Sequence, residues 1–264
     1  MREDALLIPI ASIAGNTVRP LSFLRADNGN TALTREARAL TGTTWRLWLP
    51  AAGTPIDVNV LRPAMADSHC AAQQVWRTSH VARVPEPHTF PIKKVGLAVR
   101  GAAVERADDV STLPDDGSRR VGRLITQLTH AKETERLTRQ PQDPFAKYDA
   151  AKRASTPVRI GALRRHTVDN TSTYYFEASK TYLPHETELI IGWVVESPLG
   201  LNSYHVRMFD DVEKEGENAV VWGVVRSGGR SYWVFEWQGY ESESYAVHEW
   251  PSGATRLKID GGGC

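Results

Sequence analysis

Cysteine is scarce in this sequence, as are the usual signatures of a metal or cofactor site. The chain has two cysteines in 264 residues. His69, Cys70, His80 and His88 fall in one region, but their spacing matches neither the close ligand pairs of structural zinc sites nor a His-Glu-x-x-His helix. A Walker phosphate loop, a Gly-x-Gly-x-x-Gly turn and a Gly-x-Ser-x-Gly elbow are also missing. We therefore expect neither metal nor cofactor, and the motifs leave open whether the protein is an enzyme.

The two cysteines still carry a hypothesis about the cellular compartment. Cys264 follows three glycines, and such a flexible tail allows a terminal thiol to reach a distant partner. A single long-range disulfide between Cys70 and Cys264 would fit a periplasmic or secreted protein. The alternative is one buried and one exposed thiol, which would fit the cytoplasm equally well.

Long hydrophobic runs are absent as well. No stretch approaches the ~20 apolar residues that span a bilayer. The run Leu6–Ile13 is interrupted by Pro9 and preceded by Glu3 and Asp4, whereas a signal peptide has a basic start and a longer apolar stretch. With 41% apolar and 24% charged residues, the composition is that of a globular protein. The sequence predicts a soluble chain without a transmembrane segment, and any export leader would have been removed.

The chain as a whole has almost no excess of one charge sign, because its formal net charge is +1. The charges are nevertheless segregated. Residues 118–165 hold 12 Lys and Arg against 4 Asp and Glu, whereas residues 169–250 hold 5 against 14. We favour the interpretation that these blocks are complementary surfaces of one fold that meet each other. The alternative is a nucleic-acid-associated protein that uses basic helices within residues 118–154, and nucleic acid is not the partner we expect.

The first half of the chain mixes strands and helices. Residues 5–26 read as extended, residues 31–40 as a brief helix, and residues 43–49 and 56–61 as a hairpin. Residues 95–104 are strand-like.

Two helices are predicted in the centre of the chain. Val121, Leu124, Ile125 and Leu128 form one apolar stripe, and Pro141 ends that pattern. Asp143-Pro144 then begins a second helix in the preferred order of cap and first-turn proline, and this helix runs to about residue 154.

From residue 158 onward the pattern is that of an antiparallel β-domain. Turn signals recur at short intervals, and Gly228-Gly229 suits a tight hairpin turn. We expect a β-rich α+β fold with a mixed N-terminal region at residues 1–156 and an aromatic-rich antiparallel meander or sandwich at residues 157–264, as separate domains or around one shared core. The eight strands expected there are residues 158–166, 172–177, 189–195, 203–209, 219–226, 231–237, 244–249 and 255–259.

Aromatic residues in the last third are the best functional lead. Five of the eight tryptophans lie between residues 193 and 250. Strand alternation places Trp233, Phe235 and Trp237 on one face and Glu236 on the other. Three aromatic rings in a row could form a platform for sugar rings, but a buried core row is the commoner meaning of such a pattern.

Three function classes follow from these residues. The first is a non-catalytic exported or envelope protein that binds a protein or glycan partner through its C-terminal β-domain, with Trp233, Trp237 and Glu236 as ligand-binding residues. The second is a hydrolase acting on a polysaccharide or ester, in which Glu236 would pair with Glu249 or Asp210 as acid and base. The third is the nucleic-acid-associated protein described above. The first hypothesis leads because no catalytic motif supports the second.

Overall fold

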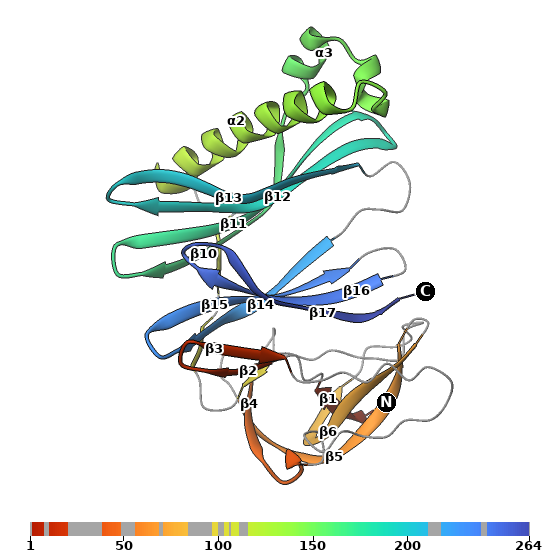
Figure 1. Cartoon of the computed structure of the whole chain (residues 1–264), viewed down its shortest axis with the longest axis vertical. Helices are drawn as coiled ribbons and strands as arrows, with labels where there is room; N and C mark the ends of the chain where they lie inside the picture. Colours follow the sequence, from red (N-terminus) through yellow and green to blue (C-terminus); the bar gives the residue numbers. More distant parts are fainter. Residues whose placement is uncertain are drawn as a thin grey trace. The chain divides into compact units, whose positions relative to one another are not determined.

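The computed structural model describes residues 2–7, 11–20, 39–48, 56–68, 71–83, 97–99, 103–105, 107–110, 116–210, 218–238 and 242–263. The chain forms two compact units (Figure 1). Unit 1 contains Met1–Arg106, Asn218–Trp250 and Ala254–Cys264, and unit 2 contains Ala107–Glu217 and Pro251–Gly253. The expected boundary between residues 156 and 157 falls inside unit 2, because the central helix and the strands that follow share one core.

Unit 1 consists of antiparallel sheets. One has the strand order β1-β6-β5-β4-β7, a second has the order β17-β16-β15-β14-β8, and β2 and β3 form a separate hairpin. The strands are β1 (Arg2–Leu7), β2 (Ala11–Ala14), β3 (Thr17–Pro20), β4 (Thr44–Trp48), β5 (Ile56–Ser68), β6 (Ala71–Arg83), β7 (Leu97–Val99), β8 (Ala103–Glu105), β14 (Asn218–Ser227), β15 (Arg230–Gln238), β16 (Ser242–Trp250) and β17 (Ala254–Gly263).

Local sequence explains two of the unit 1 hairpins. The predicted pairing of β4 with β5 is confirmed, and alternate residues of these strands, Leu47, Val58 and Val60, are buried in one cluster. Gly228 and Gly229 have φ angles of 58° and 74°, which only glycine adopts readily, and they form the turn between β14 and β15. The long β5–β6 hairpin was not predicted beyond residue 61, although it continues to residue 83.

Unit 2 is one antiparallel sheet with a helix on one face (Figure 1). The sheet order is β13-β12-β11-β10-β9, so the four long strands form a meander and β13 is an edge strand. Its elements are β9 (Asp108–Asp109), α2 (Asp116–Arg139), the 3₁₀ helix η2 (Pro144–Lys147), α3 (Ala150–Ser155), β10 (Arg159–Val168), β11 (Thr171–Leu183), β12 (Glu186–Ser197) and β13 (Gly200–Asp210).

The core of unit 2 lies between α2 and this sheet. The predicted helical stripe is confirmed, since Val121 and Ile125 are fully buried and Leu124 and Leu128 pack against them at the margin. From the sheet the core receives Leu163, Tyr174, Phe176, Ala178, Ile190 and Val194.

The second central helix forms in two pieces. Asp143 accepts a hydrogen bond from the Phe145 N–H (2.9 Å) and Pro144 takes the first turn, as expected from their order. The segment is only a 3₁₀ turn, however, because the chain becomes extended at Tyr148. Asp149 then caps α3 by accepting from the Lys152 N–H (2.7 Å).

The expected fold class is confirmed, because the structure is β-rich, its sheets are antiparallel, and all eight C-terminal strands are present. The predicted helix at residues 31–40 lies largely outside the described residues, as do Cys70 and Cys264. In the described part of the chain, no helix is both long enough and apolar enough to cross a membrane.

Gly192 in β12 provides a test of core packing in unit 2. A Cβ atom at this position would lie 3.0 Å from Val206 Cγ2 and 3.1 Å from the buried ring of Phe176. Gly192→Ala is therefore expected to lower the free energy of unfolding by about 1–3 kcal/mol through overpacking, measured by chemical denaturation. Gly161→Ala in β10 is the matched control, because its nearest atom is Glu177 O at 3.9 Å. Equal stability of the two variants would contradict the packing at Gly192.

Candidate functional site

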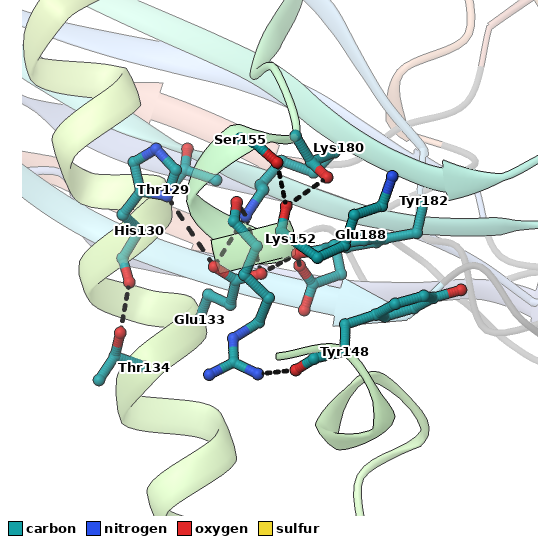
Figure 2. A network of polar contacts seen from close by, with 12 residues as sticks. Thr129, His130, Glu133, Thr134, Tyr148, Lys152, Ser155, Lys180, Tyr182 and Glu188 are labelled. Atoms are coloured by element: carbon teal, nitrogen blue, oxygen red, sulfur yellow. Dashed lines mark hydrogen bonds and ion pairs between the residues drawn. The ribbon is translucent and has the colours of Figure 1, made fainter. Parts of the chain in front are cut away.

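One end of the unit 2 core is polar. Glu133, Lys180, Tyr182 and Glu188 lie together there (Figure 2). With Arg136, which lies beside Glu188, they form the set that we call the polar core. Lys180 is 0% exposed, Glu188 1% and Glu133 3%. Fully buried charges are expensive unless they are paired, so this cluster needs a physical account.

Three elements turn from apolar to polar at this end of the core. In α2 the buried row Val121, Ile125, Thr129 and Glu133 repeats every fourth residue, so Glu133 continues the predicted apolar stripe. In β11 the row Phe176, Ala178, Lys180 and Tyr182 repeats every second residue. In β12 Glu188 stands two residues before the core residue Ile190. The polar core is thus the continuation of three apolar rows.

Lys180 is the centre of the polar core. Its Nζ atom donates to Glu133 Oε1, Glu133 Oε2 and the Arg153 carbonyl oxygen, each at 2.8 Å. These three bonds use all donors of the ammonium group. The Nζ atom also lies 5.2 Å from the centroid of the Tyr182 ring, a cation–π distance.

The pKa values of the neighbouring carboxyl groups Glu133 and Glu188 are shifted in opposite directions. Burial alone would raise the pKa of Glu133, but hydrogen bonds from Lys180, Tyr182 and Glu188 lower it overall. Burial raises the pKa of Glu188 to about 8, and the charge of Glu133 and the hydrogen bond to it act in the same direction. A raised pKa favours the protonated form of Glu188 at neutral pH, and in that form Glu188 can donate to the Glu133 carboxylate. The single hydroxyl proton of Tyr182 is donated to Glu133, and the hydroxyl oxygen also lies 3.3 Å from Glu188 Oε2.

Arg136 connects the polar core to the surface. It stands one helical turn after Glu133, and its side chain is 14% exposed. Its Nε atom donates to Asp143 Oδ2 at 2.6 Å, and its Nη1 atom lies 3.8 Å from Glu188 Oε1. With Glu188 neutral, the cations Lys180 and Arg136 balance the anions Glu133 and Asp143.

Arg136 also lines a surface pocket of about 780 Å³ between α2, the segment after it and β13, which we call the α2–β13 pocket. This volume is typical of a ligand site, for which about 300–1,000 Å³ is usual. Four lining side chains are cationic and two are carboxylates. The lining residues are Lys132, Glu135, Arg136, Arg139, Gln140, Gln142, Asp143, Pro144, Val206, Arg207, Met208 and Phe209.

The two parts of this site differ in the chemistry they can perform. Glu133 and Glu188 resemble an acid–base pair, but their burial leaves no access for a substrate in this conformation. The described lining of the pocket is accessible and has a surplus of positive charge, which suits the binding of carboxylate or phosphate groups. Over the described part of the chain, no three His, Cys, Asp or Glu side chains are grouped to hold a metal ion.

The aromatic row predicted in unit 1 is present but buried. Trp233 stacks on Phe235 with ring centroids 6.0 Å apart, and Phe235 and Trp237 are 6.2 Å apart. Trp233 is 1% exposed and Trp237 6%, so neither ring face is open to a sugar. These exposures fit the core interpretation, and the ligand-binding roles of Trp233 and Trp237 remain without a supporting contact.

Glu236 is also buried, at 1% exposed, and accepts a hydrogen bond from Trp222 Nε1 at 3.0 Å. In the β15–β16 register Glu236 stands opposite Tyr245, whereas Glu249 stands opposite Tyr232. The two carboxylates are therefore four residues apart along the ladder, about 13 Å at the usual rise per residue. The structure does not bring Glu236 and Glu249 together as acid and base, and the other suggested partner, Asp210, belongs to unit 2.

Sequence reasoning missed the polar core and the pocket. One signal was available, because Thr129 and Glu133 continue the apolar stripe of α2 at the same spacing. Of the other residues singled out, His69, Cys70, His88 and Cys264 lie outside the described part, as does the side chain of His80.

The comparisons with known proteins add no relative from which a role could be carried over. No protein-family model matches the chain, no curated protein matches it, and no solved structure matches it. The functional argument therefore depends on the geometry above.

The neutral state of Glu188 predicts an unusual pH dependence. Because its pKa is raised from near 4.5 to about 8 on folding, the folded chain keeps a proton that the unfolded chain loses over this range. This contribution to stability is complete below about pH 4.5 and is lost as the pH rises to about 8, by about 1.4 kcal/mol per pH unit. Glu188→Gln retains a neutral donor to Glu133, so its stability relative to the unchanged protein should rise between about pH 5 and pH 9, measured by denaturation.

Glu186 provides the matched control on the same strand. It accepts from Lys147 Nζ at 2.7 Å and from the Tyr148 hydroxyl, and these bonds lower its pKa. Glu186→Gln should therefore lower stability at neutral pH and lose this effect in acid, the opposite trend. If the difference in unfolding free energy between Glu188→Gln and the unchanged protein does not vary with pH, Glu188 is ionised in the folded protein at neutral pH.

Proposed function

We propose that this chain is a non-catalytic binding protein that holds an acidic segment of a protein partner in the α2–β13 pocket. The observation that supports this is the charge of the pocket lining, with four cationic side chains against two carboxylates. Asp143 is already engaged by Arg136 at 2.6 Å. The single carboxylate of Glu135 forms salt bridges with two cations, Lys132 at 2.8 Å and Arg139 at 2.6 Å. The pocket therefore favours an anionic occupant.

This proposal keeps the binding class expected from the sequence but places it in a different unit. The tryptophan row of unit 1 is buried, whereas Arg139 and Arg207 are exposed. A hydrolase is less well supported, because the best-placed carboxyl pair, Glu133 and Glu188, is buried as well.

The test is binding of a fluorescent acidic peptide to the full chain, followed by anisotropy. Replacing both Arg139 and Arg207 by alanine should weaken binding by about tenfold, equivalent to about 1.4 kcal/mol, and binding to the unchanged protein should weaken with salt. Glu135→Gln should strengthen it, because Lys132 and Arg139 lose the carboxylate they share. The control replaces Arg119 and Arg123, which are exposed on the same helix but outside the pocket, and should leave binding unchanged.

Two outcomes would overturn the proposal. One is equal loss of binding in the pocket and control variants, which would show a general attraction to helix charge. The other is a single-stranded oligonucleotide that binds more tightly than the acidic peptide, which would favour the nucleic-acid class instead.

We also propose that the protein is exported, with Cys70 and Cys264 linked. A non-reducing peptide map of protein from its natural host should then recover the two cysteine peptides as one species. Recovery of two free thiols would remove the argument for export and leave the pocket proposal untouched.

A further inference from the structure

The α2–β13 pocket opens on the edge of strand β13 and not on one of its faces. Val206 and Met208 pack against the core beneath α2. Strand alternation directs Arg207 and Phe209 to the opposite face. All four residues nevertheless line the pocket. Because the α2–β13 pocket is lined by side chains from both faces of β13, it must border the backbone edge of this strand, which lies between the two faces.

That edge is the outer edge of the unit 2 sheet. In the described part of the chain β13 pairs with β12 alone, with Met208 opposite Ile190 and Arg207 opposite Ile191. In such a ladder half of the backbone N–H and C=O groups bond to the neighbouring strand and the other half point away. The groups that point away at residues 206–209 therefore face the pocket, where they can pair with an added strand.

The opposite wall of the pocket supplies charge. Lys132, Arg136 and Arg139 come from the last two turns of α2 and Arg207 from β13 itself. A strand lying in the pocket would thus have β13 backbone on one side and cationic side chains around it. The four lining residues of β13 extend over about 14 Å, which is the length of about four residues of a bound strand.

We propose that an acidic segment of a protein partner binds by adding itself as a strand to β13 at residues 206–209, with its carboxylates toward Lys132, Arg139 and Arg207. This inference rests on the proposed function and specifies how the partner is held. Backbone pairing provides the affinity, and the cations select an acidic sequence.

The shape and charge of β13 are consistent with one kind of added strand. A register shift between Ile191 and Trp193 and a positive φ of 48° at His205 disrupt the ladder just before the pocket. Such irregularities and a cationic residue such as Arg207 are common protections of an edge against pairing with a second copy of itself. Pairing β13 with another β13 would bring two Arg207 residues together, whereas an acidic strand meets them favourably.

The experiment uses three peptides of about eight residues in which pairs of glutamates alternate with pairs of valines, so that carboxylates lie on both faces of the added strand. One peptide is unmodified. The second carries backbone N-methyl groups on its odd-numbered residues, and the third carries them on its even-numbered residues. Successive backbone N–H groups of a strand point to opposite edges, so only one methylated peptide blocks the edge that faces β13. We expect this peptide to lose at least about tenfold in affinity and the other to stay within about twofold of the unmodified peptide.

The unchanged full-length protein gives a second readout that requires no variant to fold. Amide hydrogen exchange at residues 206–209 should slow on addition of the unmodified peptide, because their outward N–H groups become bonded. Exchange in β10, within the same sheet, should not change.

The outcomes separate this inference from the proposed function. If both methylated peptides bind as well as the unmodified one and exchange at residues 206–209 is unaltered, strand addition is wrong while acidic binding stands. If both methylated peptides bind less tightly than the unmodified peptide by the same factor, the bound peptide does not pair with β13 through one of its edges, and strand addition is again wrong. If no acidic peptide binds, the proposed function fails together with this inference.

Discussion

The buried ammonium group of Lys180 is the constraint that organises unit 2. A charge at 0% exposure must be neutralised within the protein, and Glu133 and the Arg153 carbonyl provide its partners at 2.8 Å. These bonds tie β11 to α2 and to the end of α3, and the hydrogen bond from Tyr182 to Glu133 joins β11 to α2 a second time. Removing one partner of such a pair costs about 3–5 kcal/mol, because the other charge is left buried. Burial and the neighbouring Glu133 carboxylate together raise the pKa of Glu188, and the nearby cations Arg136 and Lys180 only partly offset this shift.

The pocket depends on this arrangement through Arg136. Glu133 fixes the rotation of α2, and Arg136, one turn further along, is then held between Glu188 and Asp143. Asp143 also caps the 3₁₀ turn at Phe145, so one carboxylate fixes the segment after α2 as well. The helix, this segment and β13 form the walls of the pocket. The proposed binding surface is thus built on a network whose charged groups Lys180, Glu133 and Glu188 are buried.

Much of the fold could be predicted from the sequence, whereas the site could not. Alternating residues and Gly228-Gly229 predict the C-terminal strands because those signals are local. Asp143-Pro144 predicts where the second helix begins, but nothing local shows that the chain turns extended at Tyr148, whose ring stacks on Tyr182 at 4.4 Å. The pair of Glu133 and Lys180 is separated by 47 residues, so only the folded chain brings it together. Strand alternation identified the tryptophan row, yet alternation cannot distinguish a buried face from an exposed one.

The segregation of charge along the sequence explains why the pocket is basic. Blocks 118–165 and 169–250 were expected to meet each other, and they do so where Arg120 pairs with Glu196 and Lys147 with Glu186. These contacts use acidic residues of β12, which lies inside the sheet. Among the described side chains that line the pocket, β13 contributes the cation Arg207, and the only carboxylates are Glu135 and Asp143, both close in the chain to the cations at the end of α2. Among the described residues, the basic block is therefore paired with carboxylates on the inner strand β12 and stays in surplus beside the outer strand β13. In the described part of the chain, the outer edge of β13 provides both backbone groups without a neighbouring strand and positive charge, and the proposed acidic strand would satisfy the two together.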